Sequence, residues 1–419
     1  MNREEEKMTV TTEKARGVWG SAPSHNYEQL ASRYRDIFHR IREGAVQREN
    51  DRKLLFEEIN LLKEAGFGAI RIPREEGGLG ATLPELFNLL IELAEADSNL
   101  PQALRAHFAF VEMVLNSPKG EQRSTWIKRI LEGDIVGNAW SEVGTAKAGS
   151  FLTNVTKGED DQLLLNGTKY YSTGTIYADW ILVLATKEEV NKVFAVISRY
   201  AKGVDVFDDW DGFGQKLTGS GTTRFSNVPI KESEILTEEF NAKYLAAFFQ
   251  MMHLATLAGI AISAANDLSK AVAERKRTYT HSAAARSSED PQVLQVVGKV
   301  HSLAYSSGAI VLKAAETLQK AYELRLAGSV KEEELVNDEA EIEVSQAQIV
   351  VTRLTLDATT LLFDGLGASA TSQTKSFDRY WRNARTIASH NPLIYKERVI
   401  GDYAVNKTRP PYVWHVGKN

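Results

Sequence analysis

The sequence predicts an α+β fold built from three parts: a helical N-terminal domain, a middle antiparallel β domain and a C-terminal helical bundle. Apolar residues recur at helical spacing in the first and last thirds of the 419 residues. The middle third instead has short runs of β-branched and aromatic residues separated by Gly, Asn and Asp. At about 150 residues per domain, this length suits two or three domains. We expect them at residues 1–134, 135–235 and 236–419.

The N-terminal part is expected to be helical from about residue 27 to residue 132. Residues 54–62 carry the apolar stripe of one helix, which Gly66 ends because glycine readily adopts a left-handed conformation. The Gly77–Gly80 cluster predicts a loop. Helical spacing resumes at Leu83–Ala96, and a shorter helix covers residues 126–131.

The middle part is expected to consist of short strands. The predicted strands are residues 162–165, 169–173, 180–184, 193–198 and 222–225. Asn166-Gly167 between the first two predicts a hairpin turn. The segment is too short for a parallel sheet with crossover helices, so we expect antiparallel pairing.

The C-terminal part is expected to be a bundle of long helices. Residues 240–277 contain no proline and are rich in Ala, Leu and Met. Residues 293–327 and 331–363 repeat this pattern. Helices this apolar are stable only when packed against one another.

Composition excludes several function classes. The 50 Lys+Arg against 55 Asp+Glu give a net charge of −5, without the clustered basic face that nucleic acid requires. The absence of cysteine excludes disulfide scaffolds, zinc–thiolate sites and cysteine nucleophiles. No metal-binding spacing, P-loop or GxGxxG fingerprint is present. Because no signal peptide or long apolar run occurs, we expect a cytoplasmic protein without a membrane partner.

Two histidines are candidates for chemistry. His390 follows an expected helix end, where a titratable ring could serve a site but would also suit the helix dipole. His107 lies among Phe108, Phe110 and other apolar residues, a setting more typical of a satisfied core histidine.

Two short segments could bind a planar ligand. Asn138, Trp140 and Ser141 place an amide, an indole and a hydroxyl close together, although an ordinary strand with one buried tryptophan would look the same. Residues 218–223 are rich in hydroxyls and could hold an anion or a ring carbonyl, or form a simple turn.

Taken in order, four segments resemble motifs of the acyl-CoA dehydrogenase superfamily. Residues 72–80 (IPREEGGLG) resemble its N-terminal signature, and residues 138–150 resemble the strand and loop beside the flavin. Residues 167–174 (GTKYYSTG) resemble the strand over the flavin ring, and residues 215–228 the end of the β domain. The resemblance covers nearly the whole chain and implies a middle β-barrel, a C-terminal four-helix bundle, bound flavin and a homotetramer.

One branch of the superfamily matches better than the dehydrogenases themselves. Residues 382–392 contain no carboxylate where dehydrogenases commonly carry their catalytic glutamate, and the FAD-clasping segment at residues 363–367 is altered. Together with residues 210–222, the 382–392 stretch resembles the two-component flavin-dependent monooxygenases, which use O2 and reduced FMN from a separate reductase.

The resemblance implies roles for individual residues. His390 matches the branch's C-terminal histidine near the flavin C4a–N5 edge, His107 its N-terminal active-site histidine, and Asn138 a polar residue facing the ring. These three are the predicted catalytic residues. The predicted cofactor-binding residues are Asn138, Trp140, Ser141, Tyr171, Thr173, Arg277, Ser282 and Arg379. Phe108, Phe110, Tyr171 and Trp140 are candidates for lining the pocket.

The predicted function is oxygenation of a small organosulfur or nitrogen compound by reduced FMN and O2, through a C4a-hydroperoxyflavin. The alternative is FAD-dependent α,β-desaturation of an acyl-CoA thioester with an unusual base. A third hypothesis is a flavin-free binding or structural descendant of the fold, since fold alone does not determine function.

Overall fold

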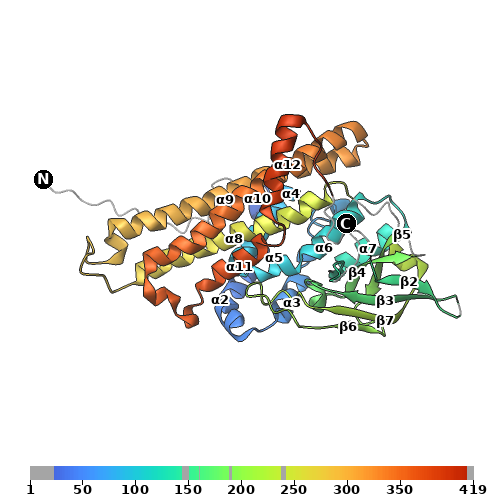
Figure 1. The fold of residues 1–419 in the computed structure, drawn as a ribbon, viewed down its shortest axis with the longest axis horizontal. Helices are drawn as coiled ribbons and strands as arrows, with labels where there is room; N and C mark the ends of the chain where they lie inside the picture. The colour runs from blue at the N-terminus through green and yellow to red at the C-terminus, as the bar shows by residue number, and fades with distance from the viewer. Residues whose placement is uncertain (1–22, 144–150, 160, 188–190, 237–241, 413–419) are drawn as a thin grey trace.

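The computed structural model describes residues 23–143, 151–159, 161–187, 191–236 and 242–412. Figure 1 shows three long helices side by side at one end of the molecule and a β-sheet at the other. The N-terminal helices lie between these two parts and contact both.

The N-terminal part is helical, as predicted. Its helices are α1 (Tyr27–Ala31), α2 (Arg35–Asp51), α3 (Phe56–Glu64), α4 (Leu83–Ala96), α5 (Asn99–Ala103), α6 (Arg105–Asn116) and α7 (Glu121–Leu131). Gly66 lies just after α3 with φ 70°, which confirms the predicted helix end. The Thr82 hydroxyl and the Glu85 carboxylate form a capping box that begins α4.

The middle part is one mixed sheet. Its strands are β1 (Val136–Ala139), β2 (Asn154–Lys157), β3 (Leu163–Lys169), β4 (Trp180–Lys187), β5 (Asn191–Ser198), β6 (Val204–Val206), β7 (Thr223–Ile230) and β8 (Ile235–Leu236). Their order is β6-β7-β3-β2-β4-β5-β8, and β1 pairs with β4. The β1–β4 and β2–β4 pairs are parallel, so the expectation of purely antiparallel pairing is wrong. The described pairings do not close the sheet, and the predicted barrel is not confirmed.

The predicted hairpin at Asn166-Gly167 is also wrong. Both residues lie within β3, where the register with β7 shifts between Leu165 and Gly167. Gly167 has φ 147°, and a Cβ there would lie 2.6 Å from the Thr153 Cα. The glycine therefore serves a bulge and a close chain approach, the other use of glycine within strands.

The C-terminal part contains the three predicted long helices, α8 (Leu245–Glu274), α9 (Pro291–Leu326) and α10 (Val330–Leu366), followed by α11 (Asp378–Ala388) and α12 (Leu393–Asn406). Helix α4 packs against α8 and α9, so N- and C-terminal helices share one continuous core. A four-helix bundle made by the C-terminal part alone is therefore not confirmed. By length and composition α8 could cross a membrane, but 83% of its apolar window is buried, as in a core helix.

Candidate active site

His390 lies where α6, α8 and the loop after α11 meet, and we call the side-chain cluster of Arg105, Phe249, His253 and His390 the recess. The loop is held at the end of α11 by the His390 N–H, which donates to the Ile387 carbonyl at 3.1 Å. The imidazole contacts the ring of His253 on α8, with 4.5 Å between centroids. Its Nε2 lies 3.4 Å from Arg105 Nη2, at the start of α6. Three segments far apart in the sequence thus meet at one imidazole.

Both histidines of this pair are neutral at pH 7. The outer edge of His390 is exposed to water, but desolvation by the surrounding protein, followed by the Arg105 charge, lowers its pKa to about 4. Burial is also the first cause that holds the pKa of His253 well below 6.5, and Arg105 adds to it. A neutral imidazole has one N–H donor and one acceptor nitrogen. Because a guanidinium can only donate, His390 Nε2 accepts from Arg105 and its Nδ1–H faces Asn391 Oδ1 at 3.3 Å, whereas the N–H of His253 has no described partner.

His253 is an unusual core residue. It is only 1% exposed, and neither ring nitrogen has a hydrogen-bond partner among the described residues. Buried polar groups normally have partners, and one without them suggests a missing ligand or water. Two hydrogen bonds fix the loop that carries His390. Asn391 Nδ2 donates to Gln250 Oε1 at 2.7 Å, and Gln348 Nε2 donates to the Asn391 carbonyl at 2.9 Å.

The β-sheet side of the recess is formed by Trp140, directly after β1. Its ring contacts Phe249 of α8 and Phe194 of β5, each with 5.3 Å between centroids. The Arg105 guanidinium lies over the Phe249 ring, 4.9 Å from the ring centroid. The indole N–H of Trp140 is buried without a partner in the described structure. Phe249 therefore connects Trp140 to the Arg105–His390 cluster.

A chain of hydroxyls lies at the end of β3. Thr173 Oγ1 and Ser220 Oγ are 2.8 Å apart, and Ser220 Oγ is 2.7 Å from Thr218 Oγ1. The neighbouring Ser172 hydroxyl is buried and has no described partner. Thr218 and Ser220 thus form a buried polar cluster with Thr173.

Close backbone packing positions this cluster beside β1. Gly174 has φ 77°, and a Cβ there would lie 1.9 Å from the Ala103 carbonyl oxygen of α5. Thr175 Oγ1 donates to the carbonyl of Asn138 on β1 at 2.9 Å. Asn138 itself is 9% exposed. Thr175 thus ties the segment that carries Thr173 to Asn138, and Trp140 lies two residues beyond Asn138; their part in flavin binding stays a prediction.

This region fits the edge of a planar heteroaromatic ring such as flavin. The unpartnered Trp140 Nε1 belongs to an aromatic surface, and the unpartnered Ser172 Oγ directly precedes Thr173 of the hydroxyl cluster. A ring that carries carbonyl oxygens and nitrogens along its edge would satisfy such donors. Trp140, Ser172, Thr173 and Ser220 are the residues that would hold it.

His107 does not share the recess. It is 0% exposed, its Nε2 lies 3.0 Å from the Gly68 carbonyl, and its Nδ1 accepts the Val136 N–H at 3.3 Å. Both ring nitrogens are therefore occupied by backbone groups and neither is free to reach a ligand. Burial lowers the pKa of His107 to about 4. These backbone contacts hold the His107 ring against the start of β1, and a catalytic role for it stays a prediction.

Two predicted flavin-binding residues face outward. Ser141 is exposed and forms a bridge with Tyr170. Tyr171 is 56% exposed, has φ 59° and packs its ring edge-on against Trp210 at 6.1 Å. Residues 144–150 of the loop matched to the family's flavin loop lie outside the described residues.

Three further predicted residues lie away from His390. Arg277 is exposed and Ser282 donates to Asp290, both in the segment between α8 and α9 at the far end of the bundle (Figure 1). At 1.5 Å per residue, α8 separates that end from His253 by roughly 30 Å. Arg379 is 9% exposed and pairs with Asp267 at 3.2 Å, which gives it a counter-ion within the helical core.

Sequence reasoning missed Arg105, Phe249 and His253, and two of its candidates for lining the pocket are not exposed. Phe108 and Phe110 are fully buried core residues. A cation at position 105 within an otherwise apolar stretch was a usable signal, since charged residues are rarely buried without reason.

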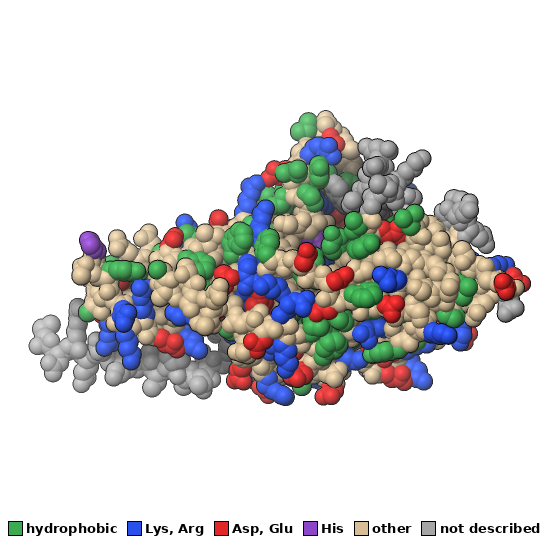
Figure 2. Space-filling model, turned by 60° about the horizontal axis from the view of Figure 1, so that its bottom comes forward, with side chains coloured by type: hydrophobic (Ala, Val, Ile, Leu, Met, Phe, Trp, Pro, Cys, Tyr) green, Lys and Arg blue, Asp and Glu red, His purple; other side chains and the backbone are tan. Residues whose placement is uncertain are grey.

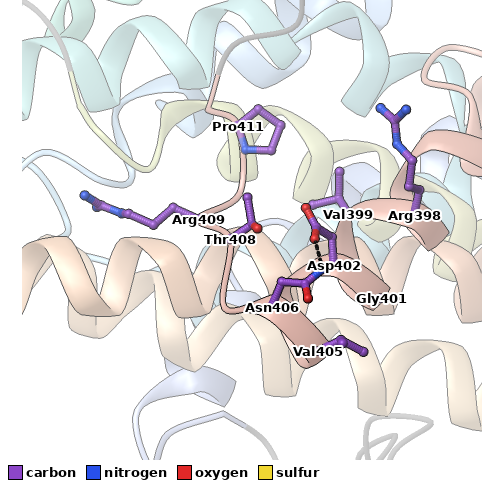
Figure 3. Close-up of a pocket in the computed structure, with 9 residues that line it drawn as sticks. All are labelled: Arg398, Val399, Gly401, Asp402, Val405, Asn406, Thr408, Arg409 and Pro411. Atoms are coloured by element: carbon purple, nitrogen blue, oxygen red, sulfur yellow. Dashed lines mark hydrogen bonds between the residues drawn. The ribbon is translucent and has the colours of Figure 1, made fainter.

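Elsewhere in the described structure there are few alternative candidates for a functional site. No group of three His, Asp or Glu side chains in the described ranges could hold a metal ion. An open pocket of about 680 Å³ lies between α12 and the segment after it, lined by residues such as Asp402 and Arg409 (Figure 3). It contains no predicted site residue, and Asn406 already donates to Asp402 there at 2.7 Å.

Comparison with known families agrees with this geometry. The acyl-CoA dehydrogenase N-terminal domain matches residues 24–134, and an acyl-CoA dehydrogenase C-terminal domain matches residues 251–393. Together these ranges cover more than half of the chain. The chain belongs to the acyl-CoA dehydrogenase superfamily.

Within the superfamily, similar proteins that match about 90% of this chain include several monooxygenases. A probable FMNH2-dependent monooxygenase, SfnC from Pseudomonas putida, is 26% identical over 90% of this chain and 94% of its own. The FMN-bound dibenzothiophene monooxygenase TdsC from Paenibacillus sp. A11-2 superposes with a TM-score of 0.82 at 27% identity, covering 91% of this chain and 98% of its own. The methanesulfinate monooxygenase MsuC from Pseudomonas fluorescens gives 0.82 at 25% identity, with the same coverage.

Proposed function

We propose that this chain is a flavin-dependent monooxygenase that uses reduced FMN and O2 to oxygenate a small organosulfur or nitrogen compound. The observation that carries the proposal is the neutral His390–His253 pair beside unpartnered buried donors, with no carboxylate in contact with His390 among the described residues. FMN-bound TdsC and the FMNH2-dependent relative support FMN as the cofactor.

The residues of the recess divide into binding and chemical roles. Trp140, Thr173 and Ser220 would hold the ring edge, and Asn138 lies beside them on β1. When bound, reduced FMN supplies two electrons, so that one atom of O2 goes to the substrate and the other leaves as water. His390, still neutral, would exchange the 3.3 Å contact of its Nδ1–H with Asn391 Oδ1 for a hydrogen bond to the reacting oxygen, and Asn138 would assist from the sheet side.

Neutrality of His390 matters for this role. An imidazolium would deliver a proton and favour loss of H2O2 before oxygen transfer, whereas a neutral ring supports the oxygen without that step. Desolvation and Arg105, which lower the pKa of His390 to about 4, keep the ring neutral throughout the physiological range.

Acyl-CoA dehydrogenation is the weaker alternative. It needs a base to remove the α-proton of the thioester. The described groups that contact His390 are a guanidinium, an imidazole and an amide, none of which is a carboxylate. The monooxygenase relatives further support the first function.

The test uses purified protein with an NADH:FMN reductase and 18O2. Dibenzothiophene and methanesulfinate serve as substrates, because relatives are named for them. We expect one 18O atom per product molecule and NADH consumption close to product formation. W140F, which removes the unpartnered indole N–H, should weaken FMN binding by about tenfold, the loss expected from one buried hydrogen bond. Anaerobic bleaching of bound flavin by an acyl-CoA, with no 18O transfer, would refute the proposal.

Further features belong to the same proposal. The reductase is a separate protein, the protein is cytoplasmic, and the domains divide near residues 134 and 235. We propose a homotetramer in which Arg277 of one chain serves the flavin of its neighbour. Exposed apolar side chains support this, for example Ile394 (70%) and Val405 (79%) on α12, and hydrophobic patches lie among mixed charges on the face in Figure 2. Light scattering on a sizing column would measure the oligomeric state.

A further inference from the structure

Arg105 is a cation in the recess without a counter-ion. Its guanidinium lies over Phe249 and 3.4 Å from His390 Nε2. No described carboxylate forms an ion pair with it. Burial alone lowers its pKa to about 10, whereas a neighbouring carboxylate would have raised the pKa.

The buried arginines of the described structure, unlike Arg105, have carboxylate partners. The four buried arginines of the described structure all pair with carboxylates: Arg48 with Asp97 and Glu58, Arg71 with Glu112, Arg123 with Glu76, and Arg379 with Asp267. Removing a charge from water is costly unless it is paired. Arg105 differs from these four in having no described carboxylate partner, which it shares with Arg129, a partly buried arginine that stacks on aromatic rings outside the recess.

The groups around Arg105 also favour an anion. His253 is 1% exposed with two unpartnered ring nitrogens, so it has a hydrogen bond to donate. His390 contributes a second neutral imidazole at the same place. The unpartnered N–H of His253 and the guanidinium without a counter-ion make a site of positive potential that a negatively charged group would complete.

Given the proposed monooxygenase function, two chemical requirements meet at one point. The atom that accepts oxygen must lie near His390, and an anionic oxygen must lie near Arg105, which His390 contacts at 3.4 Å. A sulfinate satisfies both within one small group, because its sulfur keeps a lone pair and its two oxygens share a negative charge. A planar guanidinium can bind both oxygens of such a group.

We propose that Arg105 binds the anionic group of the substrate and that the substrate is a small organic sulfinate. The sulfur lone pair forms the new S–O bond, converting the sulfinate to a sulfonate. One atom of O2 enters the product, and the second leaves as water with two electrons and two protons from reduced FMN. Arg105 is thus a specificity-determining residue, and His390 acts on the reacting oxygen.

The test compares matched ligands that differ by one charge. Methanesulfinate is paired with dimethyl sulfoxide, and benzenesulfinate with methyl phenyl sulfoxide. Binding to protein saturated with oxidised FMN is measured by calorimetry, so that no turnover occurs, and FMN affinity is measured separately by fluorescence. The variants are R105Q, R105K and the control R129Q. Arg129 also stacks on aromatic rings, over Trp126 at 4.6 Å and Trp180 at 3.9 Å, but lies outside the recess.

We expect the wild type to bind each sulfinate at least about tenfold more tightly than its matched sulfoxide, a difference of about 1.4 kcal/mol. R105Q should remove the preference for sulfinate while keeping the sulfoxide and FMN affinities within about twofold. R105K should retain part of the preference, and R129Q should retain all of it. Equal affinities in the wild type, or no binding of any of the four compounds, would overturn the inference. Loss of FMN affinity in R105Q would instead assign the arginine to the flavin. Failure of the wild type to bind FMN would refute the proposed function itself.

Discussion

The substitution H107Q tests whether this histidine positions β1 or takes part in catalysis. Burial lowers the pKa of His107 to about 4 in the folded protein, against about 6.5 in the unfolded chain. Below pH 6.5 the unfolded state therefore takes up a proton that the folded state does not, and stability is lost as the pH falls towards 4. At pH 5.0 this linkage destabilises the wild type by about 2 kcal/mol relative to pH 8.

H107Q removes the titrating group while its amide can still donate to the Gly68 carbonyl. We expect the variant to lose about 1–3 kcal/mol at pH 8, because the Val136 N–H loses its acceptor. Its further loss between pH 8 and pH 5 should be about 2 kcal/mol smaller than that of the wild type. Urea unfolding at both pH values, followed by tryptophan fluorescence, measures the difference.

The control is H39Q, at an exposed histidine of α2, which should show the wild-type decline. Folded H107Q should keep FMN affinity and product per NADH within about twofold at pH 8. An unchanged acid dependence would refute the linkage argument. Loss of coupling in a stable H107Q protein would return His107 to the catalytic residues.

Three further substitutions probe the recess and its support. H390A should lower product per NADH by about tenfold or more and release H2O2, since an oxygen-stabilising hydrogen bond is lost, while FMN affinity stays within about twofold. E112Q should destabilise the protein by about 3–5 kcal/mol in urea unfolding, because Arg71, 2.7 Å away, is left buried without its counter-ion. G174A should abolish FMN binding in a fluorescence titration, because its Cβ would lie 1.9 Å from the Ala103 carbonyl and the residue has φ 77°.

Each has a matched control. E57Q removes an exposed ion pair with Lys53 and should change stability by less than about 0.5 kcal/mol. G120A adds a Cβ with nothing within 4 Å and should bind FMN normally. Full coupling in H390A, E112Q as stable as the wild type, or normal flavin binding in G174A would each contradict the corresponding argument.

The local pattern of the sequence predicted the helices well. Residues 240–277, 293–327 and 331–363 correspond closely to α8, α9 and α10, because apolar periodicity and the absence of proline are properties of neighbouring residues. The family motifs led correctly to the superfamily and its monooxygenase branch. His390 was singled out by its position after a helix end and by the resemblance.

The turn at Asn166-Gly167 shows where local pattern fails. The pair is a common hairpin signal, yet tertiary contacts with Thr153 and β7 use the glycine for a bulge. The parallel pairing of β1 with β4 likewise depends on a long-range choice of neighbour, which strand-length patterns do not specify.

The sequence by itself determined the helical segments, the family and the presence of His390 at a helix end, because these depend on residues close together in the chain. Only the tertiary structure decided which side chains His390 meets. Arg105 reaches it across 285 positions, while His107, two residues further along α6, is held by backbone groups. One turn of helix directs neighbouring side chains to different faces. Packing therefore placed Arg105 in the recess and His107 in the core.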